Sequence, residues 1–510
     1  MVLSWLLIAT LPLLLHLLPG GSFSCVPGSG NSSGNHTGLI CRLTKAAALV
    51  LNQETTGVIQ ATYRQATFPN VTGESSIPLL GSMKHVFKNL QVNNMSIEKS
   101  DVDLGEERGI SIDIQNVAVL FKGTIYYSYT SWLLSLHQSV DFEIESQADL
   151  YLSVNLACDR GRVAVTISDC FLNFDKLILR LQKDEETSWI QQLFTDFVSF
   201  TLRHVIKKQI CAEIHQMANL LADFILDQAA AFIQDGNVAI STALISDPVL
   251  TDGYIESRHT GDIFYKNLTY FQQSNAIPGE QVEERMFNLW VSEQLINSLF
   301  LAAYLEGHLS LSLSDQELLR LLQHEDPVGQ PNLLQQIIPD IPAHDLVLHL
   351  WPLRAPVILF TPPGTILQSS VAVELRVKRS DKDPYVVLYM EMDVKTTIET
   401  SYSDQKVRLR VTDNLWSLKV VKSAVEIALD KNKAQRCLEK FFSGGGLKKI
   451  ISYVEFYLMD LLNKKGLHHF EILNPLIQTE EGYVIIATDF AFPRHLLETF
   501  LRSLPSLVRA

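Results

Sequence analysis

Residues 140–158 read VDFEIESQADLYLSVNLAC, and this stretch decides the fold. Its even-numbered positions are apolar except for Ser146, whereas its odd-numbered positions are mostly charged or polar. Alternation with a period of two is typical of a β-strand with one buried face, and ordinary strands keep it for about five or six residues. At about 3.3 Å per residue, a strand of this length would run roughly 60 Å. We therefore predict an unusually long, one-sided strand, with a turn at 159–161 and a shorter strand after it.

The same pattern recurs about 245 residues later in the chain. Residues 385–402, YVVLYMEMDVKTTIETSY, alternate in the same way, and the polar turn SDQK at 403–406 leads to a shorter alternating run. The predicted apolar face consists of Val386, Leu388, Met390, Met392, Val394 and Ile398. A long strand, a turn and a shorter strand in each half of the chain favour a duplicated architecture.

Helical periodicity surrounds both sets of strands. We predict long amphipathic helices at 43–66, 188–234, 285–307 and 447–466. Between the halves, residues 337–364 contain six prolines, which break helices and fit edge strands or an extended linker. Long helices against the apolar faces of twisted antiparallel sheets predict an α+β fold with two elongated lobes.

The start of the chain predicts secretion. Residues 1–24 hold an apolar run followed by small residues, so we expect a signal peptide cleaved before Cys25. A transmembrane anchor is the alternative, but Pro12, Pro19 and the terminal position favour the signal peptide. No later stretch is predicted to span a bilayer. N-x-S/T sequons, which fit a glycosylated extracellular protein, occur at Asn31, Asn35, Asn70, Asn94 and Asn267.

Charge, chain length and cysteine count limit the partners and the architecture. A net charge of −14 and a pI near 5.5 disfavour nucleic acid, and they disfavour a surface that seeks anionic lipid as a whole. After removal of the signal peptide, 510 − 24 = 486 residues remain, which is too long for one ordinary core. The six cysteines leave room for one or two structural disulfides in an oxidising compartment.

No catalytic constellation is apparent. The one match to the hydrolase elbow G-x-S-x-G is GNSSG at 30–34, which lies among glycines and sequons without the strand and helix that an elbow needs. No cysteine or carboxylate stands at ligand spacing around His468-His469 or around the pair His344 and His349, so we predict neither a metal site nor a cofactor. The sequence does not indicate an enzyme.

The chain ends in FPRHLLETFLRSL, residues 492–504, which predicts a short amphipathic helix. Its apolar arc consists of Leu496, Leu497, Phe500, Leu501 and Leu504. From the pattern alone, such a helix closes an ordinary core.

Five stretches resemble the family of bactericidal/permeability-increasing protein, endotoxin-binding protein and the plasma lipid transfer proteins. They are residues 115–124, 140–146, 189–202, 247–270 and 474–504. The likeness spans nearly all of the mature chain and is weakest at about 270–345. The terminal helix is similar to the feature that distinguishes the branch exchanging neutral lipids.

The resemblance implies a boomerang of two pseudo-symmetric barrels joined by a central sheet, with a long apolar tunnel. The expected organisation is a signal peptide at 1–24, an N-terminal barrel at 25–240, a central sheet and linker at 241–285 and 335–370, a C-terminal barrel at 286–334 and 371–491, and the helix and tail at 492–510.

The function that the resemblance implies is exchange of lipid without bond chemistry. A secreted plasma monomer would carry cholesteryl ester and triglyceride in the tunnel, with a phospholipid at each of two openings, and would act at the surfaces of high- and lower-density lipoproteins. Two alternatives remain open: a phospholipid-transfer or endotoxin-binding member of the family, and a structural glycoprotein with two filled lobes.

Family positions carry over to particular residues of this chain. The polar positions beside the lipid ester correspond to Ser257 and His259. The apolar wall of the tunnel near the terminal helix corresponds to Ile486, Phe490 and Phe492. The resemblance also makes the terminal helix a lid over the tunnel mouth. Leu226 and Gln228 stand where the family has a glutamine and an arginine, which removes a cation from one opening. The residues after Leu504 are a further departure.

The resemblance also implies a pairing of cysteines. The family disulfide maps onto Cys170 and Cys211. Cys158 is then expected to stay free, and a bridge between Cys25 and Cys41 is a further option.

Overall fold

The protein is described here by a computed structural model that covers most of the chain between residues 37 and 491. The described ranges are 37–63, 67–68, 70–77, 81–107, 109–130, 135–181, 238–266, 268–270, 285–314, 345–378, 385–423, 447–464 and 471–491. Outside them the structure describes residues 25, 211, 214–216, 218–220, 222–223, 227, 277, 432, 435–436, 439, 495 and 498–499.

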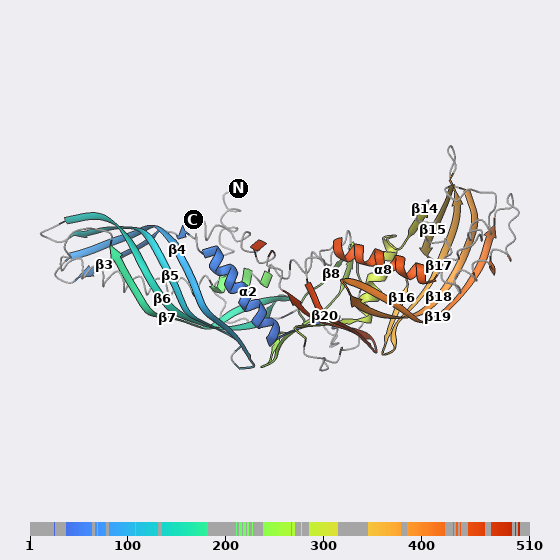
Figure 1. The fold of residues 1–510 in the computed structure, drawn as a ribbon, viewed down its shortest axis with the longest axis horizontal. Coiled ribbons are helices and arrows are strands. Elements are labelled where there is room, and N and C mark those ends of the chain that lie inside the picture. Colours follow the sequence, from blue (N-terminus) through green and yellow to red (C-terminus); the bar gives the residue numbers. More distant parts are fainter. Residues whose placement is uncertain are drawn as a thin grey trace, which may run out of the picture.

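Antiparallel sheets dominate the described chain, and the fold is mostly sheet with few helices (Figure 1). The N-terminal sheet has the order β2-β4-β5-β6-β7, and β3 also pairs with β4. Its strands are β2 (Thr67–Phe68), β3 (Val71–Ile77), β4 (Gly81–Gly105), β5 (Gly109–Thr130), β6 (Ser135–Asp159) and β7 (Arg162–Leu181). The predicted long strand is confirmed as the 25-residue β6. Val140, Phe142 and Ile144 are buried on its apolar face, whereas Asp141 and Asn155 on the other face are exposed.

The C-terminal sheet repeats this design. It has the order β14-β15-β17-β18-β19, and β16 also pairs with β17. Its strands are β14 (Leu311–Ser314), β15 (Leu346–Pro352), β16 (Val357–Thr361), β17 (Gly364–Val377), β18 (Tyr385–Ser403) and β19 (Lys406–Ser423). Its buried core includes Leu313, Leu346, Leu375, Leu388 and Met390. The predicted repeat of a long strand, a turn and a second strand is therefore confirmed, and β15 and β16 occupy the proline-rich stretch.

Both long hairpins turn in the same way. Arg160 and Gly161 between β6 and β7 have φ of 51° and 78°, and Asp404 and Gln405 between β18 and β19 have φ of 53° and 57°. Two successive positive φ values match the right-handed twist of the strands that the turn joins. The polar residues that marked these turns in the sequence thus set the register of both hairpins.

One predicted face contains an error at its first residue. Val386 was expected on the apolar face of β18, but it is exposed, and its neighbour Val387 is fully buried. Leu375 of β17 pairs with Leu388 and Arg376 pairs with Val386, so Val387 is the extra residue of a β-bulge. A bulge reverses the facing of the residues beyond it, which the alternation of the sequence alone does not show.

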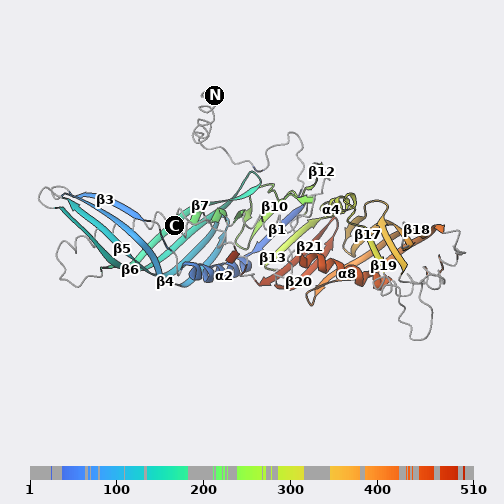
Figure 2. The ribbon, with the colours of Figure 1, turned by 90° about the horizontal axis from the view of Figure 1, so that it is seen from above.

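The middle sheet lies between the other two along the long axis (Figures 1 and 2). Its order is β20-β21-β13-β1-β10-β9. The strands are β1 (Leu39–Thr44), β9 (Val249–Leu250), β10 (Tyr254–His259), β13 (Phe287–Ser292), β20 (Glu471–Glu480) and β21 (Tyr483–Ala491). A small sheet of β8 (Val238–Ile240), β11 (Ile263–Tyr265) and β12 (Leu268–Tyr270) completes the fold. The middle sheet therefore joins strands from the beginning, the centre and the end of the chain.

Helices lie against these sheets. In α2 (Lys45–Tyr63), Asn52 donates from Nδ2 to the carbonyl of Ser100 on β4 at 2.8 Å. In α8 (Leu447–Lys464), Glu455 accepts from the backbone N–H of Leu409 on β19 at 2.7 Å. Both helices were predicted, although Leu43 and Thr44 belong to β1. Most of the helix predicted at 188–234 lies outside the described residues, and the described residues between 211 and 227 are helical.

The helix predicted at 285–307 is wrong in its first part. Phe287–Ser292 forms β13, and only Glu293–Leu305 is helical, as α4. The backbone of β13 pairs with β1 on one side and with β21 on the other, and these long-range partners override the helical pattern. Ser292 then caps α4, since its side chain accepts a hydrogen bond from the N–H of Leu295 at 3.2 Å.

Candidate functional site

One face of the middle sheet holds four of the residues predicted to contact lipid, namely Ser257, His259, Ile486 and Phe490. Ser257 on β10 pairs with Cys41 on β1. Cys41 also pairs with Leu289 on β13, which pairs with Ile486 on β21. Because residues directly opposite one another share a face, these four side chains form one row, which we call the Ser257 row. Three strand spacings of about 4.8 Å place Ser257 and Ile486 roughly 14 Å apart.

In the next row on the same face, some side chains are buried in a hydrophobic cluster. It consists of His259, Leu39, Val291 and Val484. Val291 and Val484 are buried and pack with Leu295 of α4 and Phe360 of β16. The Ser257 row differs, because Ser257, Cys41, Leu289 and Ile486 are all half-buried and keep accessible surface.

Ser257 and His259 form a hydrogen-bonded pair. Their spacing of two along β10 places both side chains on one face, and Ser257 Oγ lies 2.9 Å from His259 Nε2. On the other side of the ring, Nδ1 lies 2.7 Å from the carbonyl oxygen of Thr242. A carbonyl only accepts, so Nδ1 carries the proton. Burial lowers the pKa of His259, which keeps the ring neutral at pH 7.

Cys41 is a member of this face that the sequence did not single out. Among the described cysteines it is the one without a disulfide. Burial raises the pKa of its thiol to about 12, although the residue keeps accessible surface. A thiol with so high a pKa is protonated and unreactive, and it contributes a small apolar surface beside Ser257. The alternation of LICRLT could have placed Cys41 on the face of Leu39, but nothing local named its neighbours.

The remaining predicted site residues divide into two groups. Phe490 is half-buried on β21, on the same face as Ile486, and lies opposite Ile472 of β20. Phe492, Leu226, Gln228 and the five apolar residues predicted for the lid lie outside the described residues. Next to the lid positions, His495, Glu498 and Thr499 are helical and exposed, which fits the polar side of the predicted helix. Of the sequons, Asn70 and Asn94 are described, and both are exposed.

One part of the predicted cysteine pairing is confirmed, and the other part is wrong. Cys170 and Cys211 are bonded, as expected. Cys158 is not free, because it is bonded to Cys25, and the optional bridge between Cys25 and Cys41 is absent. The positions of the two candidate partners differ. Cys41 lies inside β1, between two partner strands, whereas Cys158 lies near the end of β6. The Cα atoms of Cys25 and Cys158 are 5.2 Å apart, within the range for a disulfide.

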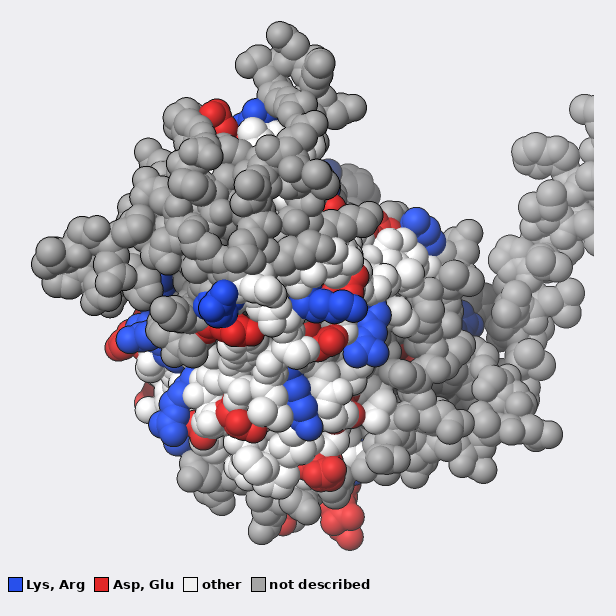
Figure 3. Space-filling view, turned by 90° about the vertical axis from the view of Figure 1, so that its right-hand side faces the viewer, with Lys and Arg blue, Asp and Glu red and all other residues white. Residues whose placement is uncertain are grey.

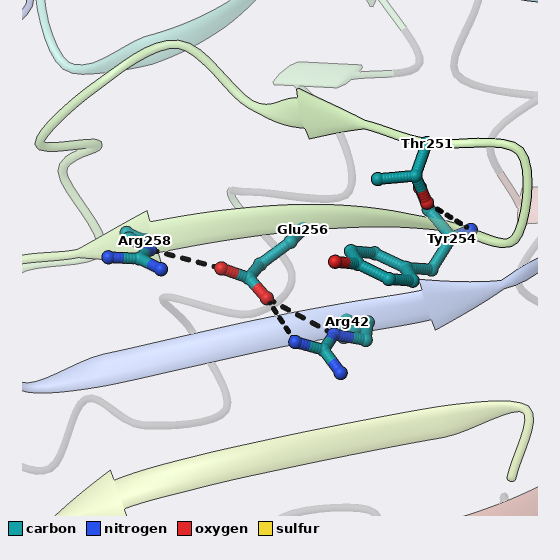
Figure 4. A network of polar contacts seen from close by, with 5 residues as sticks. All are labelled: Arg42, Thr251, Tyr254, Glu256 and Arg258. Carbon is teal, nitrogen blue, oxygen red and sulfur yellow. Dashed lines mark hydrogen bonds and ion pairs between the residues drawn. The ribbon is translucent and has the colours of Figure 1, made fainter. Parts of the chain in front are cut away.

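The opposite face of the middle sheet holds a buried polar network (Figure 4). Arg42 donates from Nη2 and Nε to Glu256 Oε2 at 2.6 and 3.1 Å, and Arg258 donates from Nε to Glu256 Oε1 at 3.0 Å. The guanidinium of Arg42 lies 4.2 Å from the ring centroid of Tyr254 and 4.7 Å from that of Trp290. The pair joins β1 to β10 over a sequence separation of 214 residues, so no sequence pattern could have shown it.

We expect Arg42→Ala to lower the free energy of unfolding by about 3 kcal/mol. Removing one partner of a buried ion pair costs about 3–5 kcal/mol, and the lower end applies because Arg258 still contacts Glu256. The matched control is Arg410→Ala, since Arg410 pairs with Glu399 at the surface and such pairs contribute about 0–1 kcal/mol. Urea unfolding followed by tryptophan fluorescence measures both. Equal losses in the two variants would contradict the role of Arg42.

The described chain contains neither a candidate metal-binding cluster nor a candidate membrane-spanning helix. Within the described ranges, no three His, Cys, Asp or Glu side chains gather where they could hold a metal ion. None of the helices that the structure describes combines the length and the hydrophobicity of a membrane-spanning segment.

Comparison with known proteins identifies the family. The N-terminal domain of the LBP / BPI / CETP family matches residues 48–223, and the C-terminal domain of that family matches residues 233–492. The chain belongs to the LBP / BPI / CETP family. The resemblance noted in the sequence is thus confirmed over nearly the whole chain.

Individual members of the LBP / BPI / CETP family match at different levels. A cholesteryl ester transfer protein of Gallus gallus is 41% identical over 467 residues, 91% of this chain and 92% of the relative. The cholesteryl ester transfer protein of Homo sapiens is 38% identical over 501 residues, 98% of this chain and 100% of the relative. The crystal structure of lipopolysaccharide binding protein covers 89% of this chain and 99% of its own, with 17% identity and a TM-score of 0.46.

Proposed function

We propose that this protein is a secreted carrier that exchanges cholesteryl esters and triglycerides, with phospholipid, between lipoprotein particles. The observation that carries the proposal is the identity of 38–41% to cholesteryl ester transfer proteins over nearly their full length. In this proposal the two end sheets belong to pseudo-symmetric barrels of a boomerang-shaped monomer. An apolar tunnel runs through both barrels and the middle sheet.

The free energy of hydrating neutral lipid makes such a tunnel necessary. A cholesteryl ester has on the order of thirty methylene-sized groups, and exposing each to water costs about 0.8 kcal/mol, so release into water costs roughly 25 kcal/mol. A continuous apolar path removes most of this barrier. The long one-sided strands supply apolar faces of the required length, as in β6 and β18.

The Ser257 row supports a lipid contact in the middle sheet. Its side chains keep accessible surface, and the cross-strand neighbours Leu289 and Ile486 are apolar. Both features fit a wall that borders a guest molecule. In the proposal Ser257, His259, Ile486 and Phe490 line the tunnel, Phe492 and the segment around Leu226 and Gln228 lie near its openings, and the helix at 492–504 covers one mouth.

Two observations favour this function over endotoxin binding. The lipopolysaccharide-binding protein of Homo sapiens is only 23% identical over 290 residues, 55% of this chain. A binder of anionic endotoxin requires a cationic surface. The chain instead carries a net charge of −14, and at the end of the molecule beside the C-terminal sheet the coloured basic and acidic residues are interleaved (Figure 3).

Extraction of the purified, secreted protein with organic solvent tests the proposal. We expect cholesteryl ester and triglyceride together with phospholipid in the extract. Phospholipid alone would instead identify a phospholipid carrier, and an extract without lipid would identify a structural glycoprotein with filled lobes. Transfer of labelled cholesteryl ester between two lipoprotein classes is the matching activity measurement.

A further inference from the structure

The two end sheets finish in edge strands that correspond position by position. The N-terminal sheet ends at β7 and the C-terminal sheet at β19, and each of these strands follows the turn of a long hairpin. In both strands the seventh residue, Ser168 or Thr412, is the extra residue of a β-bulge. The fourth residues, Val165 and Leu409, therefore occupy corresponding positions on the two edges.

Directional bonds join a helix to the edge of β7, and we call this contact the N-terminal seam. Asn219 accepts a hydrogen bond from the N–H of Val165 at 2.8 Å and donates to the carbonyl of Val165 at 2.9 Å. Arg162 forms ion pairs with Asp223 and Asp227 of the same helix, each at 2.9 Å. The disulfide already described between β7 and this helix adds a covalent link.

The contact between α8 and β19, which we call the C-terminal seam, has fewer such bonds. Glu455 accepts from the N–H of Leu409 at 2.7 Å, and Met459 Sδ accepts from the N–H of Val407 at 3.2 Å. The carbonyl of Leu409 points to the same edge as its N–H, but an ionised carboxylate has no hydrogen to donate to it. Lys406 begins β19, yet it forms no ion pair with the described residues of α8, and neither element contains a cysteine.

Apolar packing holds α8 in place instead. Ile450 and Tyr453 pack against the buried cluster that includes Leu388 and Met390. Because the hydrophobic effect is non-directional, such contacts tolerate small movements of a helix that hydrogen bonds do not. The two seams therefore differ in the free energy needed to separate the helix from the edge strand.

We propose that the C-terminal lobe, formed by its sheet and α8, opens along the C-terminal seam while the N-terminal seam stays closed. Separating α8 from β19 breaks two printed hydrogen bonds, one of them to a weak sulfur acceptor. Separating the helix from β7 breaks two hydrogen bonds and two ion pairs, and the disulfide limits the movement that remains. In its consequence for cargo the inference rests on the proposed function: the C-terminal lobe is then the one that adapts its internal volume to guests of different bulk.

Hydrogen–deuterium exchange of the full-length protein compares the two seams directly. Under native conditions we expect the amides of Val407 and Leu409 to exchange at least about tenfold faster than the amide of Val165, once intrinsic rates are divided out. A tenfold ratio corresponds to roughly one net hydrogen bond in the free energy of local opening. Fragmentation in the mass spectrometer resolves the single amides. Exchange at Val165 that is as fast as at Leu409 overturns the inference.

A pair of introduced cysteines transfers the covalent link to the C-terminal seam. Asn414 is the ninth residue of β19 as Cys170 is of β7, and Leu447, at the start of α8, corresponds to Cys211. In Asn414→Cys/Leu447→Cys we expect peptide mapping without reduction to recover the new bridge. Exchange at Leu409 should then slow about tenfold or more, because a cross-link removes the open conformations. Leu447→Cys alone is the matched control, since it makes the same substitution in α8 without a bridge.

The outcomes are separate from those that test the cargo. A bridge that does not form shows that the two seams do not correspond, and unchanged exchange at Leu409 in the bridged protein shows that another motion exposes β19. Either result overturns the inference. Exchange at Val165 should be the same in wild type and in both variants, so it monitors the rest of the fold. Because exchange is read from the backbone, these results do not depend on which lipid, if any, organic solvent extracts.

Discussion

Deletion of residues 494–510 is expected to leave a folded, secreted protein whose cholesteryl ester transfer falls to the level of a protein-free control. The last strand of the middle sheet, β21, ends at Ala491, so the deletion removes no described strand. Five apolar side chains at about 1.5–3 kcal/mol each could contribute roughly 8–15 kcal/mol if they were fully buried. A lid that docks on a lipid-lined surface retains only a fraction of this burial free energy. It can therefore detach at a lipoprotein surface, because an amphipathic helix then exchanges one apolar surface for another.

Point variants separate the lid from a nonspecific effect of truncation. Phe500→Asp places a charge on the predicted apolar arc and should reduce transfer nearly as much as the deletion. Glu498→Ala is the matched control, since Glu498 is helical and exposed, and it should transfer at the wild-type rate. Circular dichroism and secreted yield monitor the fold. Undiminished transfer by the truncated protein would remove the lid from the mechanism.

Local patterns predicted the strands well because their cause is local. Burial of every second side chain follows from the pleat, so the sequence of β6 was sufficient to place Phe142 and Ile144 inside. The same rule explains why Ser257 and His259, two residues apart on β10, share one face. It failed at Val387, where a single extra residue shifts the register, because a bulge depends on the partner strand as much as on its own.

Features that depend on distant partners could not be predicted. Phe287–Ser292 has an amphipathic pattern that a helix could also use, and only the pairing with β1 and β21 makes it a strand. The Arg42–Glu256 pair and the position of Cys41 beside Ser257 likewise exist only once β1 and β10 are neighbours. The resemblance to a family compensated in part, since it pointed to Ser257, His259 and Ile486, but it did not supply their hydrogen bonds.

The disulfide that the sequence missed is expected to contribute strongly to stability. Replacing both Cys25 and Cys158 by alanine opens a link between residues 133 apart in sequence, and loop-closure entropy predicts a loss of about 5 kcal/mol. For Cys170 and Cys211, 41 residues apart, the same relation predicts about 4 kcal/mol. The long loop matters because Cys158 ends the apolar face of β6, so the bridge fastens the predicted mature N-terminus to one of the two 25-residue strands of the N-terminal sheet.

Peptide mapping without reduction, followed by unfolding of the double variant, tests this pairing. Mapping should recover Cys25 linked to Cys158, with Cys41 alkylated much faster after denaturation, because in the folded protein the residue is half-buried and its thiol is protonated. Cys41→Ala is the matched control, since it removes a cysteine without removing a bridge, and it should stay within about 1–2 kcal/mol of wild type for the loss of one small buried group. A Cys25–Cys41 peptide, or a double variant as stable as Cys41→Ala, would show that the bridge at Cys158 does not hold the N-terminus.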